Sequence, residues 1–410
     1  MMLAQPDREL WTPRRRRSRR VECAPPFGFG LPFELPPVVL GAFAPPALSG
    51  LTLWTRADLG ITLSKSKALT WADQSGNGNH FTSLAATAPT FVISDANMSN
   101  GSSLQFAGAQ KMNTAAITIA QPNTIVVVCR VTTLSGNPGV IDDSGSRQLG
   151  YLAGGTAYAM DAGATLTGGA TDTTKHTLVY VFNGASSKLY VDSTGAAVLS
   201  GNAGAGSGTG GFIIGTQSTG YMTGGIQEVI VYNRALLVAE INQILAYTAG
   251  VRATWTPPKS LTFNGNSIMY GSLASPVTLG FSYLSAAKFP SANVYHDAFA
   301  GYTTQQCDAQ AADATTGSDL QYSALRANNV DVMLEGLNDY HANLSTPAQC
   351  ITHLTTYVTN RKAAGANKVV MCTLLPSIFM TEPDRATINT AILGGSTGAD
   401  ATADIGNTST

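Results

Sequence analysis

The sequence predicts a multidomain protein in which an all-β jelly-roll sandwich is followed by an α/β/α domain built on a parallel sheet. Short β-like runs separated by Gly, Asn and Ser turns fill residues 51–231, whereas alternating strand and helix patterns fill residues 259–410. The proline-containing "TWTPP" at 254–258 separates the two patterns. We therefore expect an Arg/Pro-rich tail (1–48), a jelly roll (49–253), a linker and a second domain.

Composition and charge limit the classes of function. The chain has 410 residues, of which 44% are hydrophobic and 12% are charged, enough for two separate cores. It contains no apolar run of roughly 18 residues, so we expect no membrane span. Residues 1–20 hold seven arginines against Asp7 and Glu9, and the remainder carries 17 basic and 23 acidic residues. Because acidic residues exceed basic ones outside the first 20 positions, we expect no binding to nucleic acid. The sequence leaves the oligomeric state open.

The tail joins an arginine block to a proline-rich tract, "PRRRRSRRVECAPPFGFGLPFELPPVVLGAFAPPALSG". It has no uninterrupted apolar segment typical of an export signal, and Glu22 and the repeated prolines argue against a twin-arginine signal. We expect residues 1–48 to be disordered. With no clear signal peptide, we expect an extracellular protein or a component of a virion released by lysis.

Five cysteines are widely spaced, without a C-x-x-C motif or Cys/His clustering. They are Cys23, Cys129, Cys307, Cys350 and Cys372. This pattern favours buried or free thiols over a disulfide framework or a zinc site. The sequence implies no cofactor.

The first domain is predicted from short apolar runs ending in one helix. The clearest runs are residues 124–131, 176–184, 188–192, 211–215 and 226–232. Asn183-Gly184 indicates a hairpin, because both residue types tolerate positive φ. In the helix at 235–250, four apolar residues are expected to share a face, namely Leu237, Ile241, Ile244 and Leu245. Many short strands with regular turns are typical of a sandwich or jelly roll.

Four segments of this domain resemble concanavalin A-like (LamG-type) jelly rolls. They are "LWTRADLGITL", "WADQSGNGNHF", "LQFAG" and "GGIQEVIVYNRALLVAEINQILAY", and the resemblance covers roughly residues 49–253. Such modules often bind glycans or serve as structural units of surface and phage proteins. The resemblance therefore implies a glycan or an acylated polysaccharide as the partner.

The glycine-rich loop of the first domain has calcium binding as an alternative interpretation. Asp73, Ser75 and Asn77 could supply oxygen ligands, but we expect their side chains to satisfy the backbone of the turn itself. His80 and His176 have no companion ligands and are interpreted as structural. We predict no metal site.

The second domain is predicted from repeated β and α segments that follow Pro258. Its strongest helix covers residues 346–364, with Thr346 as a cap and Gly365 as a stop. The apolar face of this helix consists of Ile351, Leu354 and Val358. Repeated β-α units imply a parallel sheet with helices on both faces, and ligands of such sheets gather at the carboxyl ends of the strands.

Three polar or glycine positions each follow a predicted strand of this domain. They are Ser267 in "FNGNSIMYG", Gly301 in "FAGYTTQQ" and Asn338 in "LEGLNDY". These segments resemble, in order, the first three sequence blocks of the SGNH (GDSL-like) hydrolases, and the resemblance covers about residues 259–410. It implies that Ser267 attacks an ester carbonyl. The backbone N–H groups of Ser267 and Gly301 and the side-chain amide of Asn338 would then hold the oxyanion.

Two departures from the family pattern affect this assignment. Asn266 occupies the position where the family usually has aspartate, and the final D-x-x-H block, which supplies the acid and base, is absent. His341 is an alternative base next to the oxyanion donor, and His353 is expected to be solvated. The simpler interpretation is that the chain stops one loop before the missing block, which leaves Ser267 without its general base.

The sequence therefore predicts a surface or virion-associated carbohydrate esterase, in which a lectin-like domain places a serine hydrolase domain on glycans. The alternative is a non-enzymatic phage or surface structural protein, active in assembly or adhesion, with an inactive hydrolase domain. A thioesterase or lipase is a third interpretation, disfavoured because no long apolar lid segment is found.

Overall fold

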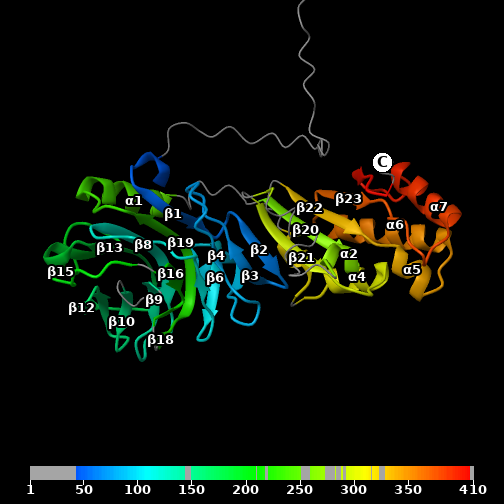
Figure 1. Cartoon of the computed structure of the whole chain (residues 1–410). Helices are drawn as coiled ribbons and strands as arrows, with labels where there is room; N and C mark the ends of the chain where they lie inside the picture. Colours follow the sequence, from blue (N-terminus) through cyan, green and yellow to red (C-terminus); the bar gives the residue numbers. More distant parts are fainter. Residues whose placement is uncertain are drawn as a thin grey trace, which may run out of the picture. The chain divides into compact units, whose positions relative to one another are not determined.

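Antiparallel strands occupy the first part of the chain, and parallel strands alternating with helices occupy the rest (Figure 1). The computed structural model describes residues 43–143, 149–208, 210–217, 220–250, 259–272, 282, 288–289, 292–314, 316–322 and 328–406. Most of the predicted tail, the predicted linker and Cys23 therefore lie outside the described residues. No described helix is long and apolar enough to cross a membrane.

The strands of the first domain are short. They are β1 (Leu51–Arg56), β2 (Ile61–Ser64), β3 (Lys67–Trp71), β4 (Phe81–Thr82), β5 (Thr90–Asp95), β6 (Gly101–Ala107), β7 (Met112–Asn113), β8 (Asn123–Val131), β9 (Gly139–Asp143), β10 (Leu149–Ala153), β11 (Ala157–Asp161), β12 (Thr165–Ala170), β13 (Lys175–Phe182), β14 (Ser187–Val191), β15 (Leu199–Gly201), β16 (Phe212–Ile214), β17 (Thr216–Gln217), β18 (Gly220–Tyr221) and β19 (Thr223–Tyr232). Three short 3-10 turns, η1 (Pro45–Ala47), η2 (Ala96–Met98) and η3 (Gly184–Ser186), lie among the described residues. All five predicted runs are strands.

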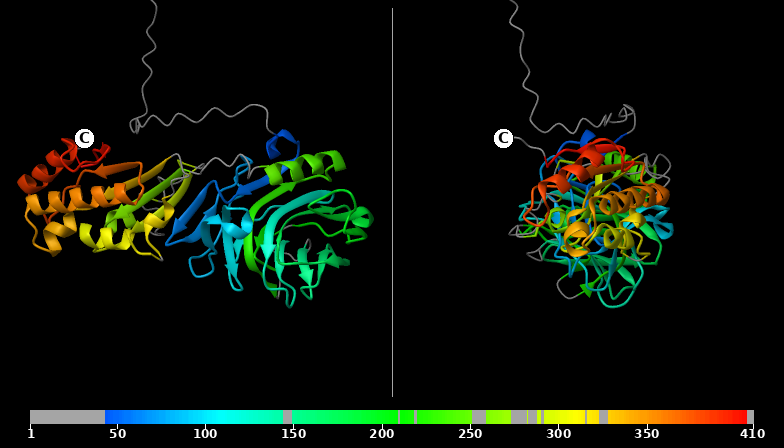
Figure 2. Two further views of the ribbon diagram at one scale, coloured as in Figure 1. Left: turned by 180° about the vertical axis from the view of Figure 1, so that it is seen from behind. Right: turned by 90° about the vertical axis from the view of Figure 1, so that its right-hand side faces the viewer.

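The backbone of this domain is an antiparallel sheet in the order β1, β19, β8, β13, β14. Alternate residues of β8 point to opposite faces. Ile125 and Val127 pack in the interior of the sandwich, whereas Val126 packs on the other face against a helix. The curved strands enclose this interior in the left view of Figure 2. The sheet is therefore buried on both faces, which explains why β8 has a continuous apolar sequence rather than an alternating one.

The helix on the outer face is α1 (Val238–Gly250), which runs along the sheet in Figure 1. Ile241, Ile244 and Leu245 are buried against the sheet as predicted, but Leu237 is 69% exposed. Leu237 precedes the first helical residue, and its backbone N–H donates to Glu240 Oε2 at 2.8 Å. The predicted apolar face was therefore wrong at this one position.

The N-terminal boundary of the domain also differs from the prediction. Phe43 packs on the ring of Tyr247, with 6.1 Å between centroids. The Tyr232 hydroxyl donates to the Pro45 carbonyl at 3.0 Å, and Leu48 packs on the same cluster. Residues 43–48 therefore belong to the jelly roll rather than to a disordered tail.

The predicted hairpin joins β13 to β14, which pair antiparallel. Only Gly184 has a positive φ, at 53°, whereas Asn183 has a φ of −151°. The connection is the 3-10 turn η3, closed by Ser187 Oγ donating to Gly184 O at 2.8 Å. The hairpin is confirmed, but it does not use a two-residue turn with two positive φ angles.

The second part of the chain forms a parallel sheet in the order β21, β20, β22, β23, β24. Its strands are β20 (Lys259–Gly265), β21 (Ala292–Ala298), β22 (Asn329–Leu334), β23 (Lys368–Cys372) and β24 (Ala401–Ala403). Its helices among the described residues are α2 (Ser267–Tyr270), α4 (Thr304–Ala311), α5 (Leu337–Ala342), α6 (Pro347–Ala364) and α7 (Glu382–Leu393), with a 3-10 turn, η5 (Ser318–Gln321). The order reverses at β20, which is the position where α/β sheets bind ligands.

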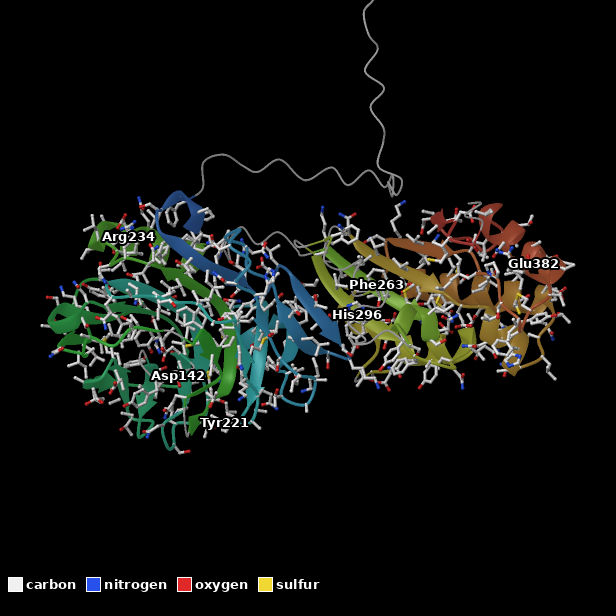
Figure 3. The ribbon with its side chains drawn as sticks, viewed as in Figure 1. Asp142, Tyr221, Arg234, Phe263, His296 and Glu382 are labelled. Atoms are coloured by element: carbon white, nitrogen blue, oxygen red, sulfur yellow. The ribbon has the colours of Figure 1, made fainter. Side chains whose placement is uncertain are left out.

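Alternate residues of the parallel strands pack into two cores. Met333 and Met371 pack with α4, α6 and α7, which lie side by side. Val332 and Val370 face the opposite side, where Phe263 of β20 stacks on His296 of β21 at 5.8 Å between centroids (Figure 3). The described residues thus show one helical layer. The sequence predicted helices on both faces of the sheet. Much of the chain between α2 and β21 lies outside the described residues, so the three-layer arrangement remains a prediction.

The long helix α6 confirms its predicted boundaries. Thr346 and Gln349 form a reciprocal capping box, Pro347 is the first residue, and Gly365 ends the helix with a φ of 115°. Leu354 is fully buried, as its position on the predicted apolar face requires.

One strand of the first domain extends the parallel sheet. β2 pairs in parallel with β21, with Thr62 opposite Val294. In addition, Ile61 N donates to the side chain of Asn293 at 3.1 Å. The edge of β21 is therefore covered rather than exposed.

Candidate functional site

The candidate site begins at the carboxyl ends of the three neighbouring strands β21, β20 and β22. Gly265, the last residue of β20, lies opposite Ala298 on one side and Leu334 on the other. Gly265 has a φ of 143°, and a Cβ on it would lie 2.3 Å from the Leu334 carbonyl oxygen. Only glycine allows the strands to approach this closely where the chain turns toward Ser267.

Ser267 is the first residue of the short helix α2 and is half-buried. Asn266 caps this helix, because its side-chain oxygen accepts the Ile268 N–H at 3.0 Å. The Asn266 backbone N–H donates to the Leu334 carbonyl at 3.1 Å, and Gly271 ends the helix with a φ of 85°. The turn that carries Ser267 is therefore fixed to the end of β22.

Gly301 lies in the turn after β21 and is exposed, with a φ of 82°. A Cβ at this position would meet no heavy atom of the described residues within 4 Å. The backbone conformation, rather than close packing of the protein itself, therefore favours glycine here. The Phe299 N–H donates to the Gly265 carbonyl at 2.9 Å, which ties this turn to the end of β20.

Asn338 lies in the first turn of α5 and joins the other two turns. Its side-chain amide donates to the Tyr302 carbonyl at 2.7 Å, one residue beyond Gly301. Its backbone N–H donates to Glu335 Oε1 at 2.9 Å. The structure therefore places Ser267, Gly301 and Asn338 on three turns at one edge of the sheet.

Asp339 is fully buried and connects α5 to two other helices. Its Oδ2 accepts from both the backbone N–H and the hydroxyl of Thr304 at 2.8 Å, at the start of α4. Its Oδ1 lies 2.8 Å from Nδ1 of His353 on α6. The expectation that His353 is merely solvated was therefore wrong, since this ring is held by a buried carboxylate.

His341 has a different environment. Its ring packs on Phe379, with 4.3 Å between the centroids, on the exposed side of α5. The structure thus gives His341 an aromatic neighbour, whereas His353 has the carboxylate partner that orients an imidazole.

Glu335 was not singled out from the sequence, although it lies at the centre of the site. Its side chain is fully buried, and its Oε1 accepts the backbone N–H groups of Gly336 and Asn338, both at 2.9 Å. Burial raises the pKa of Glu335 to about 8, against the lowering effect of these amides and of the Asn266 side chain. The available signal was an acidic residue directly after the strand "VDVML", because a position that follows a buried strand without a turn residue is itself expected to be buried.

The glycine-rich loop of the first domain satisfies its own backbone, as predicted. Asp73 Oδ1 accepts the N–H groups of Trp54 and Ser75 at 2.9 Å, and its Oδ2 accepts the Asn79 N–H at 3.0 Å. The Asn77 amide donates to carbonyls of β1. Within the described residues, no group of three or more His, Cys, Asp or Glu side chains is arranged to hold a metal ion.

The two histidines of the first domain make structural contacts. His80 Nδ1 accepts the Asp73 N–H at 3.0 Å. His176 lies between two carboxylates, with Nδ1 2.6 Å from Asp192 and Nε2 3.0 Å from Asp172. The hydrogen bond to Asp192 is the main cause that raises the pKa of His176.

Four cysteines lie in the described part of the chain, and all are buried free thiols, as predicted. They are Cys129, Cys307, Cys350 and Cys372. Burial raises the pKa of Cys129, Cys350 and Cys372 to about 12, so none is a ready nucleophile.

Residues 99–242 match the family model described as the concanavalin A-like lectin/glucanases superfamily. Together with the antiparallel sandwich, this match supports a concanavalin A-like, LamG-type jelly-roll domain in this part of the chain. No curated protein matches the chain. The match does not extend to residues 259–410, and the hydrolase resemblance of that region remains a prediction.

Solved structures with a similar outline include the Trypanosoma rangeli sialidase in complex with sialic acid, at 15% identity and a TM-score of 0.36. That match covers 49% of this chain and 33% of the sialidase, so the chain spans about one third of its length. A second similar structure is domain 4 of AbnA, a GH43 extracellular arabinanase from Geobacillus stearothermophilus, in complex with arabinotriose. It is 14% identical, and the match covers 48% of this chain and 98% of that domain, with a TM-score of 0.36. Because both TM-scores are below 0.5, no property of these proteins is transferred to this chain.

Proposed function

We propose that the protein is a glycan-associated serine esterase, in which the lectin-like jelly roll brings an SGNH-type hydrolase domain to acylated polysaccharide. One observation carries this proposal. A serine, a glycine and an asparagine follow the carboxyl ends of three adjacent parallel strands, and hydrogen bonds join their turns. That edge is where parallel α/β sheets bind ligands, and these residue types are the ones that acyl transfer needs.

In the proposed reaction, the Ser267 hydroxyl oxygen attacks the ester carbonyl carbon. The bond to the sugar oxygen then breaks, and that oxygen takes the serine proton, which leaves an acyl-serine. Water hydrolyses the acyl-serine to a carboxylic acid and restores Ser267. The N–H groups of Ser267 and Gly301 and the free amide hydrogen of Asn338 would stabilise the oxyanion in each half-reaction.

Within the 410 residues, the hydrolase resemblance assigns no general base. The 410-residue sequence contains no D-x-x-H, and a serine hydroxyl is a weak nucleophile when no base takes its proton. We therefore expect this chain to hydrolyse esters slowly, and we expect added imidazole to supply part of the missing function.

The test measures acetate release from p-nitrophenyl acetate and from acetylated polysaccharide, with and without imidazole. The imidazole-dependent hydrolysis above that of imidazole alone should disappear in Ser267→Ala and fall by about a hundredfold in Asn338→Ala, which loses an oxyanion donor. Ser272→Ala, five residues further along, is the matched control and should behave like the wild type. Loss of activity in His341→Ala or His353→Ala would instead identify an internal base.

A second candidate function is a non-enzymatic structural or adhesion role, for which the lectin-like jelly roll at residues 99–242 is the supporting observation. In that case the folded chain would release no acetate beyond the Ser267→Ala background, even with imidazole. A glycan array with the complete chain separates the glycan proposal from the esterase proposal. Binding without hydrolysis would support adhesion, and neither binding nor hydrolysis would leave assembly as the role.

A further inference from the structure

Glu335 lies between the turn that carries Ser267 and the turn that carries Asn338. Its Oε1 accepts the backbone N–H groups of Gly336 and Asn338 at 2.9 Å. The carbonyl of the preceding residue, Leu334, accepts the backbone N–H of Asn266 at 3.1 Å. The end of β22 is therefore bonded to the turns on both sides of the oxyanion position.

The side chain of Asn266 completes this arrangement. Its Oδ1 is already occupied by the Ile268 N–H, so its amide nitrogen is the group available to the Glu335 carboxyl. Glu335 Oε2 has no hydrogen-bond partner among the described residues, so the Asn266 amide is a neighbour of this carboxyl group that lowers its pKa and is not bonded to it. An aspartate at position 266 would place a second carboxylate against Glu335 and would be strongly disfavoured there. The asparagine in the nucleophile block and the buried glutamate are thus complementary.

No described cation pairs with Glu335. The ionisable groups around it are Asp339 on α5, Cys307 on α4 and Cys350 on α6, and Asp339 is itself bound to His353. A buried carboxyl group in such surroundings costs free energy when it ionises, and its hydrogen bonds to two backbone amides offset part of that cost.

We propose that Glu335 is a positioning residue, which holds the Asn338 turn at the end of β22, and so sets the Asn338 amide against Ser267, through the Asn338 backbone N–H. This inference rests on the proposed function, because Asn338 and Ser267 are the oxyanion donor and the nucleophile of that proposal. When Glu335 is neutral, the donors are held without a nearby negative charge. When it ionises, its charge opposes the oxyanion that forms on Ser267 attack.

The experiment follows the rate at which a fluorophosphonate modifies Ser267 in the full chain, measured by intact mass from pH 6 to 10. Glu335→Ala should slow the modification by about tenfold or more, because the Asn338 turn loses its anchor. Glu335→Gln should stay within about threefold of the wild type at neutral pH, since its side-chain oxygen can accept the same two N–H groups. Above about pH 8 the ratio of Glu335→Gln to wild type should rise, because only the wild type gains a charge.

Glu228→Gln is the matched control, since it alters another buried glutamate, on β19 of the jelly roll. It should leave both the rate and its pH profile unchanged. A merely structural role for Glu335 would slow Glu335→Ala but leave the Glu335→Gln profile parallel to the wild type, and that result would overturn the inference.

A separate readout covers the case in which the wild type is not modified at all and the proposed function fails. In protein labelled with ¹⁵N-asparagine, the Asn338 backbone and side-chain signals should shift as Glu335 titrates, and Glu335→Gln should remove that shift. Signals that titrate alike in both proteins, or in neither, would contradict the positioning role independently of activity.

Discussion

Single residues determine which parts of this molecule respond to pH. Glu228 on β19 is buried, and one of its oxygens, Oε1, accepts from both Trp54 Nε1 and the Tyr247 hydroxyl at 2.8 Å. Burial raises the pKa of Glu228 from 4.5 to about 7, with the nearby Arg56 opposing that rise. Like Glu335, this residue is a carboxyl group whose protonation depends on its burial rather than on solvent.

We predict that Glu228→Gln removes one pH dependence of stability. Between pH 4.5 and about 7 the folded state binds more protons at this site than the unfolded state does. The free energy of unfolding of the wild type therefore falls as pH rises through that window, by at most about 1.4 kcal/mol per pH unit. Glutamine can accept hydrogen bonds from both donors and does not titrate. As pH rises through this window, the free energy of unfolding of Glu228→Gln should therefore increase relative to that of the wild type. Urea unfolding at several pH values measures this, and parallel curves for the two proteins would refute it.

At the residue scale, local sequence predicted where Ser267, Gly301 and Asn338 lie relative to the strands, whereas it did not predict the buried contacts; their catalytic role stays a proposal. Ser267, Gly301 and Asn338 each follow a strand that its apolar residues already define. Glu335, and the pairing of Asp339 with His353, depend on contacts between segments far apart in the sequence. No local pattern determines such contacts, and for that reason His353 was interpreted as solvated.

At the scale of single elements, one buried carboxyl group links a strand, a helix and a loop of the second domain. The fully buried Asp331 in the middle of β22 interrupts an otherwise apolar strand. Its carboxyl group accepts from the Tyr322 hydroxyl and the Asn264 amide at 2.7 Å, and from the Tyr357 hydroxyl at 3.1 Å. Strand β20, helix α6 and the segment after η5 are thereby tied to one point.

We predict that Asp331→Ala destabilises the second domain by about 3 kcal/mol or more, since several buried donors would lose their acceptor together. Asp331→Asn should cost less, because burial raises the pKa of Asp331 and already favours the uncharged form. Denaturant unfolding followed by circular dichroism gives both values. An unchanged midpoint for Asp331→Ala would show that the network contributes no net stability.

Element positions were predictable wherever a local signal defined an end. Thr346 as a cap and Gly365 as a stop predicted the boundaries of α6, and the apolar runs predicted the positions of the strands. The register of β20 between β21 and β22 was not predictable, because it depends on the close approach of Gly265 to Leu334.

At the scale of the whole molecule, the two patterns in the sequence correspond to two kinds of sheet with separate cores. The jelly-roll interior and the two cores of the parallel sheet consist of largely different residues. The connection through β2 and β21 could not be foreseen, because neither strand carries a sequence signal for a partner outside its own pattern.

We predict that residues 43–250 fold on their own. The fragment keeps Phe43 and Leu48, which pack with α1, and it keeps the entire antiparallel sheet. Thermal melting should therefore be cooperative, whereas a fragment that starts at residue 49 should melt at a lower temperature because that packing is lost. A soluble fragment 43–250 without a cooperative transition would show that the jelly roll depends on the second domain.

The proposed esterase requires that the sheet edge formed by Gly265, Ala298 and Leu334 carries a serine able to undergo acyl transfer. The most direct measurement is peptide mapping by mass spectrometry after the full chain reacts with a fluorophosphonate. One adduct should form, on Ser267; it should be absent from Ser267→Ala and should form more slowly in Asn338→Ala. A folded chain that forms no adduct, or one whose adduct forms equally in Ser267→Ala and so lies on another residue, would show that Ser267 is not the nucleophile.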